Sequence, residues 1–300
     1  MTTRFALNYS SQAAELVRRG RLDLDAFKCP PWPEMVATAR RVLPVYIHFP
    51  LAVGWGRGDA VDTAAAHRRG PNGYGPADWQ AVEDWLQQTD TAYVNLHLED
   101  FGADGHGLTG KARADHLVEA AITDVEAVVR RFGAGRVLLE NDHGHDVADP
   151  AVLAPEVVTA IVRATGCGLL LDVSHARLAA RRLDMDARAY IGRLPLDATR
   201  EIHLTGIQRF GSPWRERMQA NGVPPEVIAR YEGRWLDHLP LTAADWAFMG
   251  WVAEELRAGR WGQPTLITIE CGGEGPLWQA LTDAESLAEQ VPRLQALLKG

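Results

Sequence analysis

A regular alternation of short apolar segments with amphipathic segments of helical period most constrains the fold of this chain. Seven short segments are continuously apolar, which is typical of parallel strands buried on both faces. These segments are 4–8, 44–49, 92–98, 136–140, 168–173, 201–206 and 264–270. Between them lie stretches such as 113–132, whose apolar residues recur three and four positions apart, as in a helix that packs one face on a sheet. The pattern predicts an α/β fold with a parallel sheet.

The number of strand–helix units favours one barrel. An eighth strand is expected near 234–240, where the apolar pattern is weakest. Eight such units predict a single (β/α)8 barrel over residues 1–300, with the helices as an outer ring. Long loops are expected at 52–76, 100–112 and 206–233. An open doubly wound sheet is the alternative, but no GxGxxG motif follows the first strand to indicate a dinucleotide site.

Two late helices are expected to begin with a capping box. Thr242 is followed by Asp245, and Thr282 by Glu285. In this motif the side chains of the first and fourth residues each accept a hydrogen bond from the other's backbone N–H. We therefore expect helices to start at Thr242 and at Thr282.

Composition argues against several classes of protein. Lys and Arg number 31 against 39 Asp and Glu, a net charge of −8, so a basic surface for duplex nucleic acid is not expected. Cys29, Cys167 and Cys271 are too few, and odd in number, for a disulfide framework. No apolar run reaches the ~18 residues of a membrane span, and the start has no apolar signal segment. We expect a cytoplasmic protein without membrane or duplex nucleic-acid partners.

Polar residues gather where the expected strands end, which is where such barrels carry their functional groups. The candidate metal ligands there are His48, His97, Glu140, Asp172, His175, His203, Asp237, His238 and Glu270. Histidine accounts for 10 of the 300 residues, so by chance a three-residue window contains one with a probability of ~0.1. Three such windows, on the second, third and sixth strands, therefore coincide with a probability of ~10⁻³.

The chemistry of this set indicates metal. A mixture of imidazoles and carboxylates suits zinc, iron or manganese better than magnesium or calcium. The set is larger than one ion takes from a protein while keeping an open coordination position. We therefore expect two or three metal ions, with Glu140 as the bridging carboxylate between the His48 and His97 side and the Asp172 and His203 side.

Further candidates lie beside these strand ends. His143 and His145 follow the fourth strand and are predicted to carry protons, since histidine titrates near neutral pH. Asn141, Arg209 and Trp214 are predicted to contact the substrate.

Several of these stretches resemble a known family. The clearest are GCGLLLDVSH at 166–175, LPLD at 194–197 and EIHL at 201–204, with VLLEN at 137–141 and PTLI at 264–267. They resemble the xylose-isomerase-like TIM barrels, and most of all the multinuclear non-haem iron-dependent oxidative enzymes of the methanobactin-biosynthesis type. The resemblance implies metal ligands at His48, His97, Glu140, Asp172, His203 and Glu270.

This chain departs from the family pattern at three places. His175 stands where the family usually has Asn, which is more like the Asp-x-x-His of the apurinic-endonuclease branch. On the seventh strand the family normally has an Asp-x-His pair, whereas here Arg234 and Leu236 occupy those positions and Asp237 and His238 would substitute in a shifted register. The eighth strand normally ends Glu-x-Asp, whereas here it ends Thr268-Ile-Glu270.

The resemblance implies an enzyme with a di- or trinuclear iron site that uses O2 to oxidise a peptide or a small molecule. A protein that presents the peptide is an implied partner. One alternative is a zinc hydrolase that cleaves phosphate esters with a metal-bound hydroxide. Another is a sugar isomerase or epimerase that holds one metal through Glu140, Asp172, His203 and Glu270.

Overall fold

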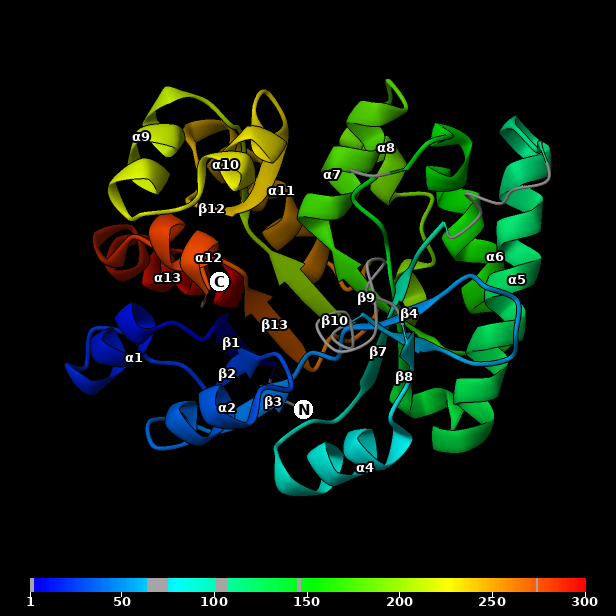
Figure 1. Cartoon of the computed structure of the whole chain (residues 1–300), viewed down its shortest axis with the longest axis horizontal. Helices are drawn as coiled ribbons and strands as arrows, with labels where there is room; N and C mark the ends of the chain where they lie inside the picture. Colours follow the sequence, from blue (N-terminus) through cyan, green and yellow to red (C-terminus); the bar gives the residue numbers. More distant parts are fainter. Residues whose placement is uncertain (1–2, 64–74, 101–106, 145–146, 274) are drawn as a thin grey trace. The chain divides into compact units, whose positions relative to one another are not determined.

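The computed structural model describes residues 3–63, 75–100, 107–144, 147–273 and 275–300 (Figure 1). It divides into two compact units. Unit 1 comprises residues 1–45, 203–260 and 265–300, and unit 2 comprises residues 46–202 and 261–264. The chain passes from one unit to the other within β3 (Val45–Ile47) and within β10 (Thr199–Leu204).

Unit 2 is built on a parallel sheet. Its strands are β4 (Leu51–Val53), β7 (Val94–Leu98), β8 (Val137–Glu140) and β9 (Gly168–Asp172). They pair in parallel in this order, and the register sets His97 opposite Glu140. Two short antiparallel strands extend the edge at β4, namely β5 (Val61–Asp62) and β6 (Gly75–Pro76). The strands β8 and β9 are buried along their whole length, which explains their continuous apolar sequences.

The helices of unit 2 follow the expected rhythm. They are α4 (Trp79–Gln88), α5 (Gly110–Phe132), α6 (Pro155–Thr165), α7 (Val173–Arg182) and α8 (Ala187–Ile191). The predicted apolar face of α5 is buried at Leu117, Ala121, Val125 and Val128. This helix lies beside α6 (Figure 1).

Unit 1 also contains parallel strands. β1 (Arg4–Asn8) lies between β2 (Ala26–Cys29) and β13 (Leu266–Ile269) and pairs in parallel with both. Beyond β13 the backbone N–H of Glu270 donates to the carbonyl of Leu204, at the end of β10. The helices packed in this unit are α1 (Ser11–Arg18), α2 (Pro33–Ala39), α11 (Ala243–Arg257), α12 (Pro276–Leu281) and α13 (Ala284–Lys299).

An antiparallel pair forms a separate part of unit 1. The expected strand near 234–240 is present as β12 (Trp235–Leu239), but it pairs antiparallel with β11 (Gly206–Arg209) rather than with a parallel neighbour. The segment expected as a loop at 206–233 contains β11, α9 (Ser212–Ala220) and α10 (Pro225–Tyr231). Phe210, Met218 and Ile228 are buried in an apolar cluster there, which also includes Ala280 and Leu281 of α12.

Two details correct the sequence-based assignment. The strand β2 was not expected, because its four residues include a lysine and are followed at once by two prolines. The capping box at Thr242 and Asp245 is confirmed, but the last helix is capped by Asp283, whose side chain accepts from the N–H of Ser286. The Thr282 hydroxyl instead bonds the carbonyl of Trp278 and the N–H of Gly273.

The predicted α/β class with parallel strands and intervening helices is confirmed in both units. Their strand pairings are compatible with a (β/α)8 barrel, and a single barrel domain stays a prediction. Within the described part of the chain, no helix is both long enough and apolar enough to span a bilayer.

Candidate metal centre

Unit 2 brings together five of the predicted ligands. His48 follows β3, His97 lies in β7, and Glu140 is the last residue of β8. Asp172 ends β9, and His175 lies in the first turn of α7, which follows directly. Because β7, β8 and β9 run in parallel, their last residues meet at one edge of the sheet.

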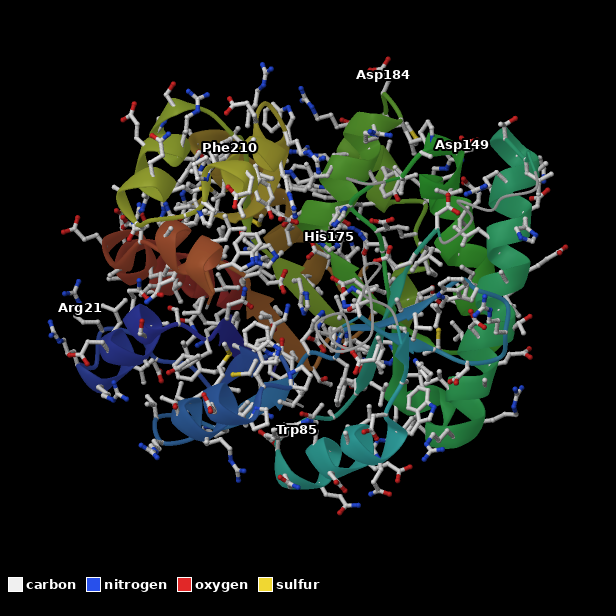
Figure 2. All side chains as sticks on the ribbon, in the orientation of Figure 1. Arg21, Trp85, Asp149, His175, Asp184 and Phe210 are labelled. Carbon is white, nitrogen blue, oxygen red and sulfur yellow. The ribbon has the colours of Figure 1, made fainter. Side chains whose placement is uncertain are left out.

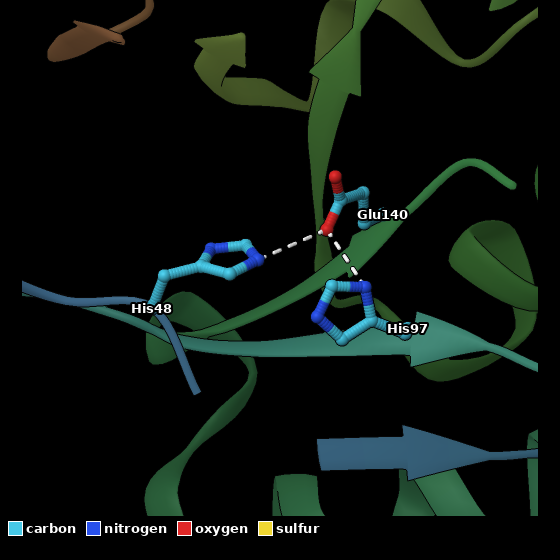
Figure 3. A group of neighbouring side chains, drawn as sticks. All are labelled: His48, His97 and Glu140. Atoms are coloured by element: carbon cyan, nitrogen blue, oxygen red, sulfur yellow. Dashed lines mark ion pairs between the residues drawn. The ribbon is translucent and has the colours of Figure 1, made fainter. Parts of the chain in front are cut away.

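The first group of ligand atoms comes from His48, His97 and Glu140 (Figure 3). The Oε2 oxygen of Glu140 lies 3.0 Å from Nδ1 of His97 and 3.4 Å from Nε2 of His48. The two imidazoles meet edge to face, with their centroids 4.9 Å apart. Since Glu140 is only 2% exposed, its charge is balanced mainly by these protein groups rather than by water.

The second group shares Glu140 and adds Asp172 and His175. Nδ1 of His175 lies 3.5 Å from Oε1 of Glu140, and Nε2 lies 3.6 Å from Oδ2 of Asp172. Oδ1 of Asp172 caps α7 by accepting from the N–H of His175 at 2.8 Å, so one carboxylate both starts the helix and faces its first histidine. Figure 2 shows His175 at this end of α7 and Asp184 beyond the other end.

The tautomer of His175 follows from its backbone neighbour. Its Nδ1 lies 2.9 Å from the carbonyl oxygen of Asn141, which can only accept a hydrogen bond. The proton of the neutral ring is therefore on Nδ1, and the lone pair is on Nε2, on the side of Asp172. A carbonyl behind the ring is the usual arrangement for a metal-binding histidine.

Two buried asparagines, Asn95 and Asn141, connect neighbouring segments at this edge of the sheet. Asn95 accepts from the N–H of Phe49 at 2.7 Å and donates to its carbonyl at 2.9 Å. The same amide nitrogen lies 3.2 Å from Nε2 of His48 and 3.4 Å from Nε2 of His97. Sequence reasoning missed Asn95, although it precedes His97 by two positions in a strand and so shares its face.

Asn141 joins the ends of β8 and β9. Its side chain donates to the carbonyl of Asp172 and accepts from the N–H of Asp172, both at 2.9 Å. Asn141 is fully buried, so these bonds fix the position of Asp172. Its predicted contact with substrate stays a prediction.

Two titratable groups at this edge have shifted pKa values. Burial lowers the pKa of His97, but the charge and hydrogen bond of Glu140 outweigh it, and the pKa is raised above 6.5. Burial raises the pKa of Asp142, whose Oδ1 lies 3.2 Å from Nδ1 of His143. The ring of His143 meets that of His175 edge to face at 5.0 Å between centroids. His145, the other predicted proton carrier, lies outside the described residues.

Unit 1 contains the other predicted ligands. Nδ1 of His203 lies 3.0 Å from Oε1 of Glu270, and Nε2 of His238 lies 3.8 Å from Oε2 of the same residue. The ammonium of Lys28 forms an ion pair with Oε1 of Glu270. Asp237 is buried in β12. Among the described residues, Asp237 and His238 belong to no set of three ligand atoms close enough to hold one ion.

The predicted substrate residues Arg209 and Trp214 lie in the β11–β12 part of unit 1. Arg209 is exposed at the end of β11, with Nε 3.4 Å from the carbonyl of Gly233. Trp214 packs against the apolar cluster around Met218. Their roles stay predictions.

The donor set of unit 2 fits a metal centre. Each of its two groups combines imidazole nitrogen with carboxylate oxygen, the combination that suits zinc, iron and manganese. Glu140 and Asp172 are both buried, and a cation between them would relieve the repulsion of two neighbouring negative charges.

Two UPF0276 proteins are similar to parts of this chain. A UPF0276 protein of Rhizorhabdus wittichii is 29% identical over 150 residues, which are 48% of this chain and 52% of the relative. A UPF0276 protein of Chromobacterium violaceum is 39% identical over 125 residues, 40% of this chain and 45% of the relative. The chain thus spans about half the length of these two relatives.

A structure of D-psicose 3-epimerase with D-tagatose from Clostridium cellulolyticum is 10% identical, with a TM-score of 0.42, over 99% of this chain and 98% of that one. The sequence model of the RiPP precursor modification enzymes MbnB/TglH/ChrH matches residues 72–232, a stretch that includes His97, Glu140 and Asp172. This match confirms the resemblance stated from the sequence. Since it covers more than half of the chain, the chain belongs to the MbnB/TglH/ChrH family of RiPP precursor modification enzymes.

Proposed function

We propose that this chain is a metal-dependent enzyme that oxidises a ribosomally made precursor peptide, with two or three iron ions and O2 as cosubstrate. One observation carries the proposal: the buried carboxylate of Glu140 belongs to two ligand groups at once. Bound iron supplies the electron transfer and O2 chemistry that side chains alone lack. The peptide substrate is proposed from the description of the family.

Glu140 is suited to hold two ions close together. Its Oε2 oxygen faces His48 and His97, whereas its Oε1 oxygen faces His175. The carboxylate of Glu140 would therefore be shared by the two groups. The proposed ligands are His48, His97 and Glu140 for the first group, and Glu140, Asp172 and His175 for the second.

The neighbouring residues orient these ligands. The carbonyl of Asn141 keeps the Nδ1 proton of His175, so that Nε2 has the lone pair. Asn95 ties the backbone of Phe49, next to His48, to the strand that carries His97. Because Asp172 is held by Asn141 and by the helix it caps, its carboxylate is positioned before any ion binds.

Proton transfer is proposed for His143. It pairs with Asp142, and its ring contacts that of His175. Imidazole titrates near neutral pH, so a histidine beside the ligands can accept and return a proton during turnover. Proton transfer by His145 stays a prediction. A cytoplasmic location of the chain also stays a prediction.

The test uses the whole chain purified without oxygen and loaded with Fe2+. Candidate precursor peptides encoded beside the gene are added with O2, and we follow O2 consumption and the change in peptide mass. His97→Ala should abolish turnover. His116→Ala is the matched control, because His116 is an exposed histidine on α5 and should leave turnover unchanged.

The zinc-loaded chain separates the alternatives. Zinc has no redox chemistry, so the zinc form should be inactive if the reaction is oxidative. Full activity of the zinc form without O2 would replace the proposal with a hydrolase, and isomerisation of a sugar would replace it with an isomerase.

A further inference from the structure

We propose that Arg57, on the 54–59 loop that follows β4, binds a carboxylate of the precursor peptide at a distance from the residue that is modified. The inference deepens the proposed function, on which it rests for the peptide substrate. It adds a binding residue that belongs to neither ligand group of unit 2, and it follows from residues of unit 2.

The loop begins at the edge of the sheet that carries the candidate ligands. β4 pairs with β7 so that Ala52 lies opposite His97. The N–H of Glu99, two residues beyond His97, donates to the carbonyl of Val53, the last residue of β4, at 3.0 Å. Gly54 then leaves the sheet so close to Glu99 that a Cβ atom on Gly54 would overlap the carbonyl oxygen of Glu99. Glycine is therefore required where the loop starts.

One buried carboxylate holds the whole loop. Asp124 of α5 is fully buried, and its two oxygens accept from the six backbone N–H groups of residues 54–59 at distances of 2.7–3.3 Å. These bonds compensate for the burial of the charge on Asp124. Because every N–H of the loop is bound, its backbone has little freedom, and a ligand that binds to it pays little for ordering it.

This loop presents a cation in a defined orientation. The guanidinium of Arg57 lies over the ring of Trp55, 4.3 Å from its centroid. Arg57 is exposed, and among the residues that the structure describes its guanidinium forms no ion pair. Stacking on the indole fixes the plane of the guanidinium. The edge of that plane is the fork that binds a carboxylate through two parallel hydrogen bonds.

Stacking on tryptophan also occurs elsewhere, at Arg131 and Arg293, in different settings. Arg131 lies 5.6 Å from the ring centroid of Trp79 and forms an ion pair with Glu83. Arg293 lies 4.0 Å from that of Trp246, on the helix α13 of unit 1. A stacked arginine is therefore not a binding site by itself. At residue 57 it is combined with a loop that starts beside the candidate ligands and is fixed by a buried carboxylate.

The position of Arg57 limits the spacing in the peptide. Gly54 lies beside Glu99, and Arg57 is three residues further along the loop. Glu99 itself is two residues beyond His97, so these chain lengths keep Arg57 within roughly 25 Å of His97. An extended peptide covers about 3.3 Å per residue, so the bound carboxylate lies within about eight residues of the modified one. Such a contact holds the peptide without touching the reacting atoms.

Peptide binding tests the inference without turnover. The full chain is loaded with Zn2+ and titrated into fluorescein-labelled precursor peptide, and the Kd is measured by fluorescence anisotropy. Arg57→Ala should raise the Kd about 10-fold. Arg57→Lys keeps the charge but loses the fork, so its Kd should lie between those of Arg57→Ala and the wild type. Arg293→Ala, the matched control, removes an exposed arginine that also stacks on tryptophan and should leave the Kd unchanged.

Changes in the peptide identify the carboxylate. Each Asp or Glu of the peptide is replaced by Asn or Gln in turn, and the C-terminus is amidated separately. One of these changes should weaken binding to the wild type about 10-fold. The same change should have no further effect on Arg57→Ala, because both changes remove the same contact. The change that meets this condition shows whether the carboxylate belongs to a side chain or to the C-terminus.

An unchanged Kd in Arg57→Ala would overturn the inference, as would a peptide in which no carboxylate matters. If the wild type oxidises the peptide and Arg57→Ala does so with the same KM, the inference is wrong and the proposed function stands. If the wild type binds the peptide through Arg57 but the Fe2+-loaded chain consumes no O2 with it, the proposed function is wrong and the inference stands.

Discussion

Glu140 in unit 2 and Glu270 in unit 1 are the same kind of residue in different surroundings. Each stands at the end of a parallel strand, and each is 2% exposed. Three imidazoles face Glu140, those of His48, His97 and His175. Two imidazoles and the ammonium of Lys28 face Glu270. An imidazole can exchange its proton for a metal ion near neutral pH, whereas an ammonium cannot coordinate one, so the neighbours decide what each carboxylate binds.

Replacing Glu140 should have the largest effect. Glu140→Gln removes a ligand from both groups of unit 2, so we expect metal affinity to fall by at least ~100-fold, measured by metal content and titration. Glu270→Gln is the matched change in unit 1 and should cost less metal, because among the described residues Glu270 belongs to one possible ligand group and Glu140 to two. Equal losses in the two variants would break the distinction between the units.

The second prediction separates the stability of unit 2 from its metal sites. Asp124 of α5 is fully buried, and its two oxygens accept from six successive backbone N–H groups, those of Gly54, Trp55, Gly56, Arg57, Gly58 and Asp59. Asp124→Asn removes the charge and turns one acceptor into a donor that faces these N–H groups. We expect a loss of roughly 2–4 kcal/mol in the free energy of unfolding, measured by urea denaturation.

Metal content of Asp124→Asn should stay at the wild-type level, because Asp124 belongs to neither ligand group. The control is Asp115→Asn on the same helix, where an exposed carboxylate pairs with Lys111, and its stability should barely change. If an Asp124 variant lost metal while remaining folded, the 54–59 loop would contribute to metal binding, and the prediction would be wrong.

The third prediction concerns the pH dependence of the metal-free protein. Glu140 raises the pKa of His97 above its value of 6.5 in the unfolded chain. The protonated ring therefore stabilises the folded state fully below pH 6.5, and this contribution disappears as the pH rises through the raised pKa. Histidine NMR should detect the shift, and Glu140→Gln should remove it. A pKa of His97 at or below 6.5 would contradict the prediction.

Metal binding should also depend on the protonation of His97. His97 must lose its proton before it binds an ion, so proton release on adding Zn2+ should be greatest at pH values below the raised pKa.

The sequence located the polar residues at the strand ends because they follow a regular pattern, and their role as metal ligands stays a prediction. Apolar runs mark the strands, and the polar residue that ends each run is visible in the chain, as at Glu140 and Asp172. Residues that act through distant partners were not predictable in this way. Asp124 looks like a surface residue of an amphipathic helix, and only the backbone of 54–59 explains its burial.

Lys28, which pairs with Glu270, was missed for a similar reason. Lys28 lies in the strand β2, which is too short and too interrupted by polar residues and prolines for its apolar pattern to be recognised. The adjacent residues Asp237 and His238 were predicted as ligands because they end a strand. However, β12 pairs antiparallel with β11, and the rule for the ends of parallel strands does not extend to it.

The smallest effects are expected at Arg209 and Arg217, two cations of the same insertion in unit 1. Arg217 donates to the carbonyls of Ala280 and Thr282, both at 2.8 Å, and pairs with Asp283 at 3.0 Å. Arg217→Ala should therefore lower the free energy of unfolding by about 1 kcal/mol, because the side chain is partly exposed and water replaces some of these bonds. Arg209 is exposed and makes one long bond, so Arg209→Ala should leave stability unchanged but raise KM for an acidic peptide a few-fold. Urea denaturation and steady-state kinetics on both variants separate the roles, and an unchanged KM in Arg209→Ala would remove this arginine from the proposed substrate contacts.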